Sequence, residues 1–436
     1  MKQKLKGYKG ITLIALIITI IVLLILAVVA ISAVKGDGII AHAKNAKKEY
    51  SEAQTNEKST MQGYLDKLEE NQLESIKIKD NLNKVLSTGG NITLEDDFGN
   101  KIKVPAGFKI ITKTDTENTD LNYTAETIDV TKGIVVEDGE GNQFVWIPVG
   151  KIYKDTEKTE ENAKTITLGR YSNFTKRNNA YTVAQKASDY GTQVKISRYY
   201  TEDTTATHNP DYKNSIAKNI GEFCTKALSS GGYYIGRYEA RVENYDASNI
   251  SKSNSNKSED WTGYIAANGK KLKLVSKANS QVWNYVTQKK ASSLCQSMYT
   301  NKPFESDLIN GYAWDTAIIF FQEFGDNSTY ASKTSVNSQQ ANTGTSGTSY
   351  TGTKDTICNV YDMASNCLEW STESYSASAS PCTKRGGAYD FGDRYTSSRG
   401  GSGNTYWCIR WRFFPSTFIY VGLNTPLTGR FFVLSA

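Results

Sequence analysis

The feature that most constrains this chain is an uncharged apolar run near its N-terminus, from Ile11 to Val34. As a helix, this run of about 24 residues would be roughly 36 Å long, and about 20 apolar residues are enough to cross a bilayer. Basic residues beside a spanning helix favour the cytoplasmic side. Such residues precede the run at Lys2, Lys4, Lys6 and Lys9. The sequence therefore predicts a transmembrane helix at 11–34, a single-pass protein of the cell membrane and an extracellular C-terminal domain.

The junction K-G-I-T-L-I at Lys9 to Ile14 resembles the leader of type IV prepilins. The resemblance implies a leader at 1–10, cut by a prepilin peptidase between Gly10 and Ile11, and it leaves pilin-like subunits open as partners. Ala15 stands where that family has a glutamate that neutralises a neighbouring subunit's terminal amine. Because an unpaired buried amine is costly, the sequence leaves incorporation into a filament open. A plain signal anchor is the alternative.

A polar segment follows the apolar run. Gly36 and Gly38 are poor helix formers, and from Ile39 apolar residues recur at steps of three and four. This pattern predicts a polar stalk helix over 35–71. The next stretch, 72–103, is predicted to be a linker with a first hairpin.

Strand and turn patterns dominate after the stalk. Two hairpins are predicted, one joining Asn91–Glu95 to Lys101–Val104 and one joining Gly133–Glu137 to Gln143–Pro148. The Thr-, Lys-, Asn- and Glu-rich stretch Lys154–Lys195 has weak periodicity and predicts insertion loops.

Two short helices are predicted among these strands. They cover Asn214–Ser229, which is amphipathic, and Val286–Met298, with Thr287 as its N-cap. Between these two helices, Gly231–Ala240 is predicted to be a strand.

Two motifs lie in the C-terminal third, V-Y-D-M-A-S-N-C-L-E-W-S at Val360–Ser371 and K-R-G-G-A-Y at Lys384–Tyr389. Asn366, Glu369 and Trp370 combine a large apolar ring with two polar groups, which predicts a buried, hydrogen-bonded structural node. Gly386 and Gly387 predict a turn where two backbones pass close together. Direct ligand contact by these motifs is the alternative.

Together with T-G-R-F-F-V-L at Thr428–Leu434, these motifs resemble the signature of the formylglycine-generating-enzyme family, which is close to Y-D-M-A-G-N-V-W-E-W, R-G-G-S-W and G-F-R. The resemblance implies a C-type-lectin-like fold over 104–436. It also implies a helix within Ser306–Phe321, which is similar to a helix of that family. The expected fold class is α+β, with a transmembrane and stalk helix followed by this loop-rich domain. No cofactor is predicted, and the resemblance leaves structural calcium open.

The thiol chemistry of that family can be compared with this chain. Its oxidases carry one cysteine two residues after the R-G-G-S-Y-type motif and another five residues further on. Those positions hold Phe391 and Thr396, and neither supplies a thiolate. Cys382 and Cys408 lie nearby but out of register. The sequence therefore predicts that the chain is not an enzyme, although an oxidase of this type stays an alternative.

Metal and nucleic-acid sites have little support. The six cysteines show no C-x-x-C spacing and the chain has two histidines, His42 and His208, so metal-ligand spacing is missing from the sequence. The disulfide pairing stays open. The formal net charge is +6, but four basic residues lie in the first ten, and no nucleic-acid partner is predicted.

The segment 390–427 mixes aromatic residues with arginines and follows no helical or strand period. Such mixtures are typical of binding surfaces, with core packing as the alternative. The predicted ligand-binding residues are Phe391, Arg394, Tyr395, Tyr406, Trp407, Arg410, Trp411, Phe413, Phe414, Phe418 and Tyr420.

The position of this segment is similar to that of the variable region in target proteins of diversity-generating retroelements. Together with the prepilin-like leader and the apolar run, this resemblance predicts a membrane-anchored, pilin-like display protein whose lectin-fold domain binds a surface or extracellular ligand, either a protein or a glycan. A structural minor pilin is a further alternative. One sequence leaves open whether 390–427 is diversified and what the ligand is.

Overall fold

In the computed structural model, the chain forms two compact units, Met1–Leu73 and Glu74–Ala436. The residues that the structure describes are 13–35, 46–50, 53–54, 57, 76–84, 91–178, 180–189, 200–201, 220–250, 261–278, 283, 285–300, 302, 304–334, 355–375, 382–387, 394–402, 415–416, 420–421 and 434–435.

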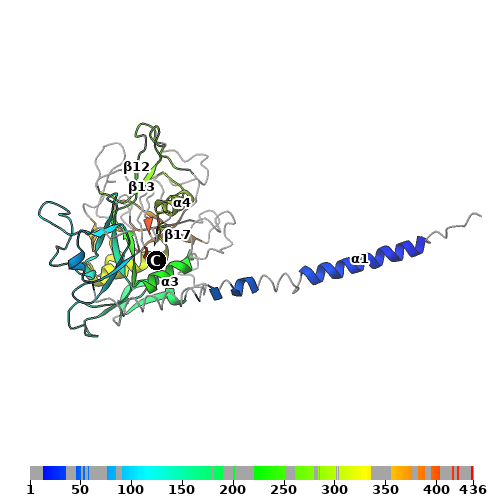
Figure 1. The fold of residues 1–436 in the computed structure, drawn as a ribbon, viewed down its shortest axis with the longest axis horizontal. Coiled ribbons are helices and arrows are strands. Elements are labelled where there is room, and N and C mark those ends of the chain that lie inside the picture. The colour runs from blue at the N-terminus through cyan, green and yellow to red at the C-terminus, as the bar shows by residue number, and fades with distance from the viewer. Residues whose placement is uncertain are drawn as a thin grey trace, which may run out of the picture. The chain divides into compact units, whose positions relative to one another are not determined.

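The N-terminal unit contains α1 (Leu13–Lys35), shown in Figure 1. Its side chains are described from Leu13 to Val29 and are exposed. Within the described ranges, no helix is long and apolar enough to cross a membrane. This finding contradicts the predictions of a transmembrane helix at 11–34, of a single-pass membrane protein and of a cell-membrane location with an extracellular C-terminal domain.

The structure describes only part of the stalk that was predicted for this unit. Residues 46–50 of the predicted stalk are helical. Most of the remaining stalk lies outside the described residues, as do Gly10 and Ile11 of the predicted cleavage site.

The C-terminal unit is mixed α+β, with antiparallel sheets that are mostly small. Its largest sheet has six strands in the order β21-β20-β11-β5-β4-β3. They are β3 (Phe108–Ile110), β4 (Val135–Asp138), β5 (Gln143–Pro148), β11 (Gly232–Gly236), β20 (Pro415–Ser416) and β21 (Tyr420–Val421). Every residue of β11 is buried, so this strand is covered on both faces and lies in the core.

A second sheet carries the C-terminal motifs. Its order is β10-β17-β18-β19, and its strands are β10 (Tyr200–Thr201), β17 (Glu369–Tyr375), β18 (Cys382–Arg385) and β19 (Arg399–Ser402). Arg385 of β18 is opposite Glu369 on one side and Arg399 on the other. The E-W and K-R-G-G motifs are therefore neighbours in one sheet.

Among the described residues, the remaining strands form six two-stranded sheets. They are β1 (Ile92–Glu95) with β2 (Lys101–Val104), β6 (Gly150–Ile152) with β7 (Lys164–Ile166), β8 (Gly169–Arg177) with β9 (Ala180–Lys186), β12 (Arg241–Glu243) with β13 (Lys273–Val275), β14 (Phe304–Glu305) with β22 (Leu434–Ser435), and β15 (Thr356–Ile357) with β16 (Val360–Tyr361).

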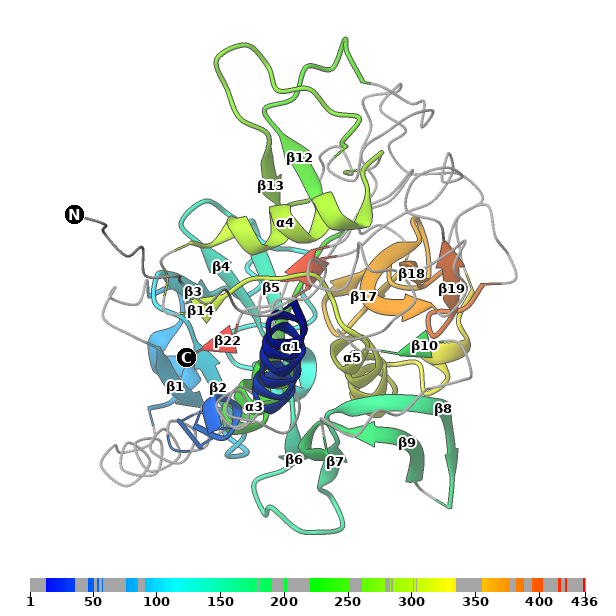
Figure 2. The same cartoon turned by 90° about the vertical axis from the view of Figure 1, so that its right-hand side faces the viewer.

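The strand predictions can be compared with these pairs. Both predicted hairpins are confirmed, as β1 with β2 and as β4 with β5. The predicted strand within Gly231–Ala240 is confirmed as β11. The insertion loops predicted over Lys154–Lys195 are wrong, because β7, β8 and β9 lie there, and β8 and β9 form a long curved ribbon (Figure 2).

The described α-helices of this unit are α3 (Ile220–Ser229), α4 (Gln288–Met298) and α5 (Gly311–Phe324). The Thr287 hydroxyl accepts a hydrogen bond from the Lys290 backbone N–H at 3.3 Å, which confirms the predicted cap of α4. α5 begins later than predicted, because Asn310 is its N-cap. The Asn310 side-chain oxygen accepts a hydrogen bond from the Ala313 backbone N–H at 2.8 Å. α5 is buried along most of its length because few of its side chains are polar. Short 3₁₀ helices are η1 (Ile78–Asn81), η2 (Val130–Lys132), η3 (Ala187–Asp189) and η5 (Tyr330–Ser332).

The glycine pair of the K-R-G-G motif lies against the backbone of the other motif. A Cβ at Gly387 would lie 1.9 Å from the carbonyl oxygen of Ala364. Gly386 has φ +82° and faces the carbonyl oxygen of Met363. The predicted close approach of two backbones is confirmed, and only residues without a Cβ allow it here.

We expect Gly387→Ala to destabilise the C-terminal unit by about 1 to 3 kcal/mol, as overpacking in a filled interior does. Gly139→Ala is the matched control, because a Cβ there meets nothing within 4 Å. The control should change the free energy of unfolding by less than about 0.5 kcal/mol. Urea unfolding of both variants tests this, and equal losses would contradict the close approach at Gly387.

Candidate functional site

The structure describes part of the segment predicted to bind ligand. Arg394 is half-buried, and Tyr395 is exposed over 46% of its surface. For Tyr420, the backbone is described in β21 but the side chain is not. The other candidates lie outside the described residues: Phe391, Tyr406, Trp407, Arg410, Trp411, Phe413, Phe414 and Phe418.

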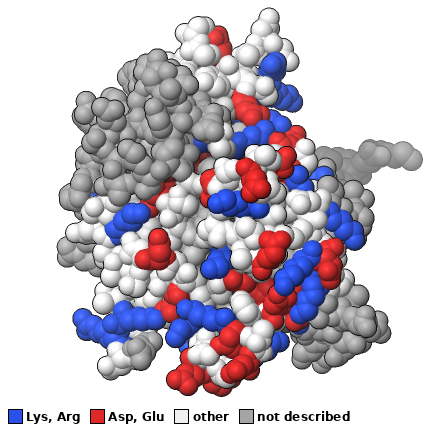
Figure 3. Space-filling view, turned by 90° about the vertical axis from the view of Figure 1, so that its left-hand side faces the viewer, with Lys and Arg blue, Asp and Glu red and all other residues white. Residues whose placement is uncertain are grey.

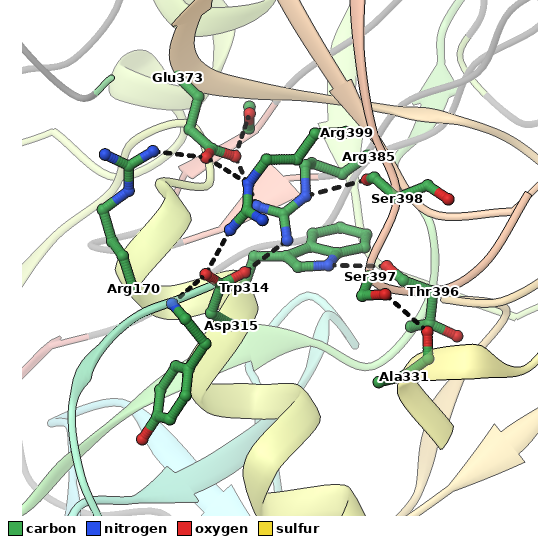
Figure 4. A network of polar contacts seen from close by, with 12 residues as sticks. Arg170, Trp314, Asp315, Ala331, Glu373, Arg385, Thr396, Ser397, Ser398 and Arg399 are labelled. Carbon is green, nitrogen blue, oxygen red and sulfur yellow. Dashed lines mark hydrogen bonds and ion pairs between the residues drawn. The ribbon is translucent and has the colours of Figure 1, made fainter. Parts of the chain in front are cut away.

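Hydrogen bonds fix the backbone that follows Tyr395. The N–H of Thr396 donates to Lys333 O at 3.1 Å, and the N–H of Ser397 donates to Ala331 O at 3.0 Å. The Trp314 indole N–H donates to the Thr396 carbonyl oxygen at 3.0 Å (Figure 4). The start of the segment is thereby held against α5 and η5.

A buried network of ion pairs adjoins this backbone (Figure 4). The Glu373 carboxylate accepts hydrogen bonds from Arg170 Nη2 and from Arg399 Nε, each at 2.8 Å. It also forms an ion pair with Arg385. Asp315 pairs with both Arg385 and Arg399. The side chain of Arg399 is 10% exposed and the other four are fully buried. We call these five residues the ion network.

The surroundings of Glu373 and Arg399 favour the charged forms of these two side chains. Burial opposes ionisation of Glu373, but the charges of Arg385, Arg399 and Arg170 outweigh burial and hold its pKa well below the ordinary value. Burial likewise opposes the charge of Arg399, and Asp315 and Glu373 reverse this and raise its pKa. Arg385 also lies over the Trp314 ring, at 5.2 Å from its centroid. The ion network therefore acts as one unit at neutral pH.

The ion network connects parts of the chain that are distant in sequence. Arg170 comes from β8, Asp315 from α5 and Glu373 from β17, while Arg385 and Arg399 come from β18 and β19. Of these five residues, only Arg385 belongs to a motif recognisable in the sequence. Arg399 lies inside the candidate segment 390–427, but its side chain takes part in the interior rather than in a binding face. In the sequence, Arg399 is a single arginine between Ser398 and Gly400. This pattern is only a weak signal of a buried ion pair.

The E-W motif forms a second buried cluster. Asn366, Glu369 and Trp370 are buried, as the sequence predicted. The Asn366 amide donates to the Glu239 carboxylate, and Asn366 has φ 56°, a left-handed conformation that asparagine tolerates. These contacts make the motif part of the scaffold.

The positions that carry thiols in the related oxidases have a structural role here. Thr396 is fully buried and holds Trp314 through its carbonyl oxygen, whereas Phe391 lies outside the described residues. The described cysteines, Cys224, Cys295, Cys358, Cys367 and Cys382, are all buried. Burial raises the pKa of Cys358 far above its ordinary value, so this thiol is unreactive at neutral pH. In the described ranges, no cluster of His, Cys, Asp and Glu could hold a metal ion.

Comparisons with known proteins add no relative. A scan against family models, a search of curated proteins and a search of solved structures each found no match to this chain. The resemblance to the formylglycine-generating-enzyme family therefore stays a prediction that depends on the three motifs.

We expect Glu373→Gln to lower the free energy of unfolding by about 3 to 5 kcal/mol at neutral pH, because it leaves buried guanidinium groups without their carboxylate partner. The folded-state pKa of Glu373 is depressed, so its stabilisation is fully present above the unfolded-state value of about 4.3. That stabilisation is lost as the pH falls from there through the folded-state pKa. The difference in free energy of unfolding between wild type and variant should therefore narrow on acidification.

Glu160→Gln is the control for this experiment. Glu160 pairs with Lys151 at 2.7 Å, but its side chain is 80% exposed, and exposed pairs contribute little to stability. Urea unfolding between neutral pH and about pH 3 measures both variants against wild type. A Glu373→Gln variant as stable as Glu160→Gln at neutral pH would contradict the assigned role of the network.

Proposed function

We propose that this chain is a recognition protein in which the segment 390–427, carried on a formylglycine-generating-enzyme-like lectin fold, binds a protein or a glycan. The scaffold consists of the two motifs and the ion network. The ligand-binding residues are the aromatic side chains and arginines of the segment that do not belong to the interior.

The observation that carries this proposal is that the segment is attached to the unit at separate points. β19 pairs with β18 in one sheet, and β20 pairs with β11 in the other, with Ser416 opposite Ile235. Tyr406, Trp407, Arg410, Trp411, Phe413 and Phe414 lie in the sequence between β19 and β20. Functional side chains are most precisely placed when the chain segment that carries them is joined to rigid strands at both ends.

Exposure at the start of the segment supports the same reading. Tyr395 is one of few large hydrophobic side chains of the C-terminal unit that are exposed, at 46%, among those described. Its backbone is nevertheless paired with Thr334. A rigid, exposed tyrosine loses little conformational entropy on binding, which makes it a suitable contact residue.

The oxidase alternative is less well supported. Its chemistry needs a thiol pair, and Thr396, at one of the two positions, is buried and bonded into the scaffold.

The proposal also includes diversification of the segment by a retroelement. Variation should then be confined to codons between Asp390 and Leu427 and should spare Arg399 and Thr396, because both side chains are interior. Sequencing this region and its neighbouring DNA tests this point. A reverse-transcriptase gene and a near copy of the 3′ coding segment would support it.

Alanine replacement of the segment's aromatic residues separates a binding face from a core. We expect Trp407→Ala, Trp411→Ala, Phe414→Ala and Tyr420→Ala each to change the free energy of unfolding by less than about 0.5 kcal/mol. Trp370→Ala is the control, because this side chain is fully buried, and it should cost about 3 to 5 kcal/mol. Thermal and urea unfolding of the full chain give these values.

Binding is measured with the same variants on panels of immobilised glycans and proteins. A ligand retained by wild type should be lost by at least two of the four aromatic variants while their folds stay intact. If three or more of these variants unfold as Trp370→Ala does, the segment belongs to the core and the proposed binding face is wrong.

A further inference from the structure

Basic side chains from separate segments gather around the C-terminal end of α5. Lys176 of β8 pairs with Glu323 of α5, and Lys154 donates to the Glu323 backbone oxygen at 3.3 Å. Lys164, at the start of β7, lies close enough to Lys154 for their charges to repel. We propose that Lys154, Lys164 and Lys176, which we call the basic surface, form a second binding site, for an anionic polysaccharide.

The charges of the basic surface are not balanced locally. The carboxylate of Glu323 is only 6% exposed and already pairs with Lys176. Among the described residues, neither Lys154 nor Lys164 forms an ion pair with a carboxylate. Two of the three ammonium groups thus lack an acidic partner, and together they attract anionic groups.

Aromatic rings hold the ammonium groups in position. Lys154 Nζ lies 5.0 Å from the centroid of the Phe324 ring, and Lys176 Nζ lies 5.2 Å from that of Tyr181. Both rings are half-buried, as is Phe174 nearby in β8. Cation–π contacts of this kind restrict two otherwise flexible side chains. The basic surface is therefore partly ordered before a ligand arrives, which reduces the entropic cost of binding.

The electrostatics of Lys154 agree with this geometry. Burial is the largest cause that lowers the pKa of Lys154, followed by the charge of Lys164. The charge of Lys176 also lowers this pKa, and the charge of Glu323 raises it. An anion bound among these lysines would relieve the repulsion and raise the pKa of Lys154. The charged form of Lys154 is therefore less stable in the free protein than it would be with an anion bound nearby.

The chemistry favours a charged polysaccharide over other polyanions. Lysine ammonium groups are compact point charges that suit carboxylate, sulfate and phosphate oxygens. The half-buried rings of Tyr181, Phe174 and Phe324 offer apolar surface to the ring faces of sugars. A nucleic acid needs a longer basic surface, whereas basic and acidic side chains are interspersed over most of the face in Figure 3.

The test measures binding of the full chain to two anionic polysaccharides, sulfated heparin and carboxylated polygalacturonate, with neutral dextran and single-stranded DNA as comparisons. We expect binding to at least one of the two anionic polysaccharides and none to dextran. Raising the salt concentration from about 50 to about 200 mM should weaken it, because exposed charges are screened. The two probes distinguish sulfate from carboxylate recognition.

Variants assign the binding to these residues. Lys164→Gln and Lys176→Gln should each weaken it about fivefold, as the loss of one exposed charge contact does. Lys164→Gln is the more decisive variant, because the Lys164 side chain has no ion pair among the described residues and its loss should leave folding unchanged. The matched control is Lys113→Gln, an exposed lysine in another loop, which should bind as wild type does.

A second readout is the pKa of Lys154, measured by NMR on ¹³C-methylated lysines with and without the polysaccharide. It should rise when the probe is bound. Trp407→Ala should leave this binding unchanged, which separates the basic surface from the segment 390–427. The proposal is overturned if neither anionic polysaccharide binds, if Lys164→Gln and Lys176→Gln both bind as Lys113→Gln does, or if DNA binds more tightly than both polysaccharides.

Discussion

The C-terminal unit depends on the buried pairing of Arg170, Arg385 and Arg399 with Asp315 and Glu373. Removing this many charges from water is expensive, and well-packed apolar residues would often be as stable. What the ion network adds is a single geometry, because each guanidinium fork accepts only a few arrangements of carboxylate oxygens. We infer that it fixes the register of β17, β18 and β19 and, through Arg399, the start of the segment 390–427.

Under the proposed function, this arrangement separates the constant part of the domain from the adaptable part. Trp314 and Asp315, adjacent on α5, hold the backbone of Thr396 and the side chain of Arg399 respectively. Glycines at 386 and 387 let the K-R-G-G turn lie against the E-W motif. Side chains that face away from these contacts can change without disturbing them, which is the property that a binding segment needs.

Some of the fold could be predicted from the sequence because its signals are local. The turn between β4 and β5 and the Thr287 cap of α4 depend on a few adjacent residues, and both are confirmed. The ribbon of β8 and β9 could not be predicted, because many of its residues are exposed and their polarity does not alternate. The apolar run at the N-terminus gave a strong local signal, and its prediction as a membrane span is nevertheless contradicted.

The candidate site was harder to predict because its contacts are distant in sequence. Arg170 and Glu373 are separated by 203 residues, and Arg399 and Asp315 by 84. No periodicity connects such positions in one sequence. The aromatic content of 390–427 indicated a binding segment, but it did not distinguish Thr396 and Arg399, which are interior, from Tyr395, which is exposed.

The most direct test of this account is amide hydrogen exchange in Asp315→Asn. Asp315 pairs with Arg385 and Arg399, so its loss should loosen the attachment of the segment. The account predicts that exchange at Thr396 and Ser397 rises by about tenfold or more, while the amides of β4 and β5 stay protected. Unchanged protection at Thr396 and Ser397, or an equal rise in β4 and β5, would contradict it.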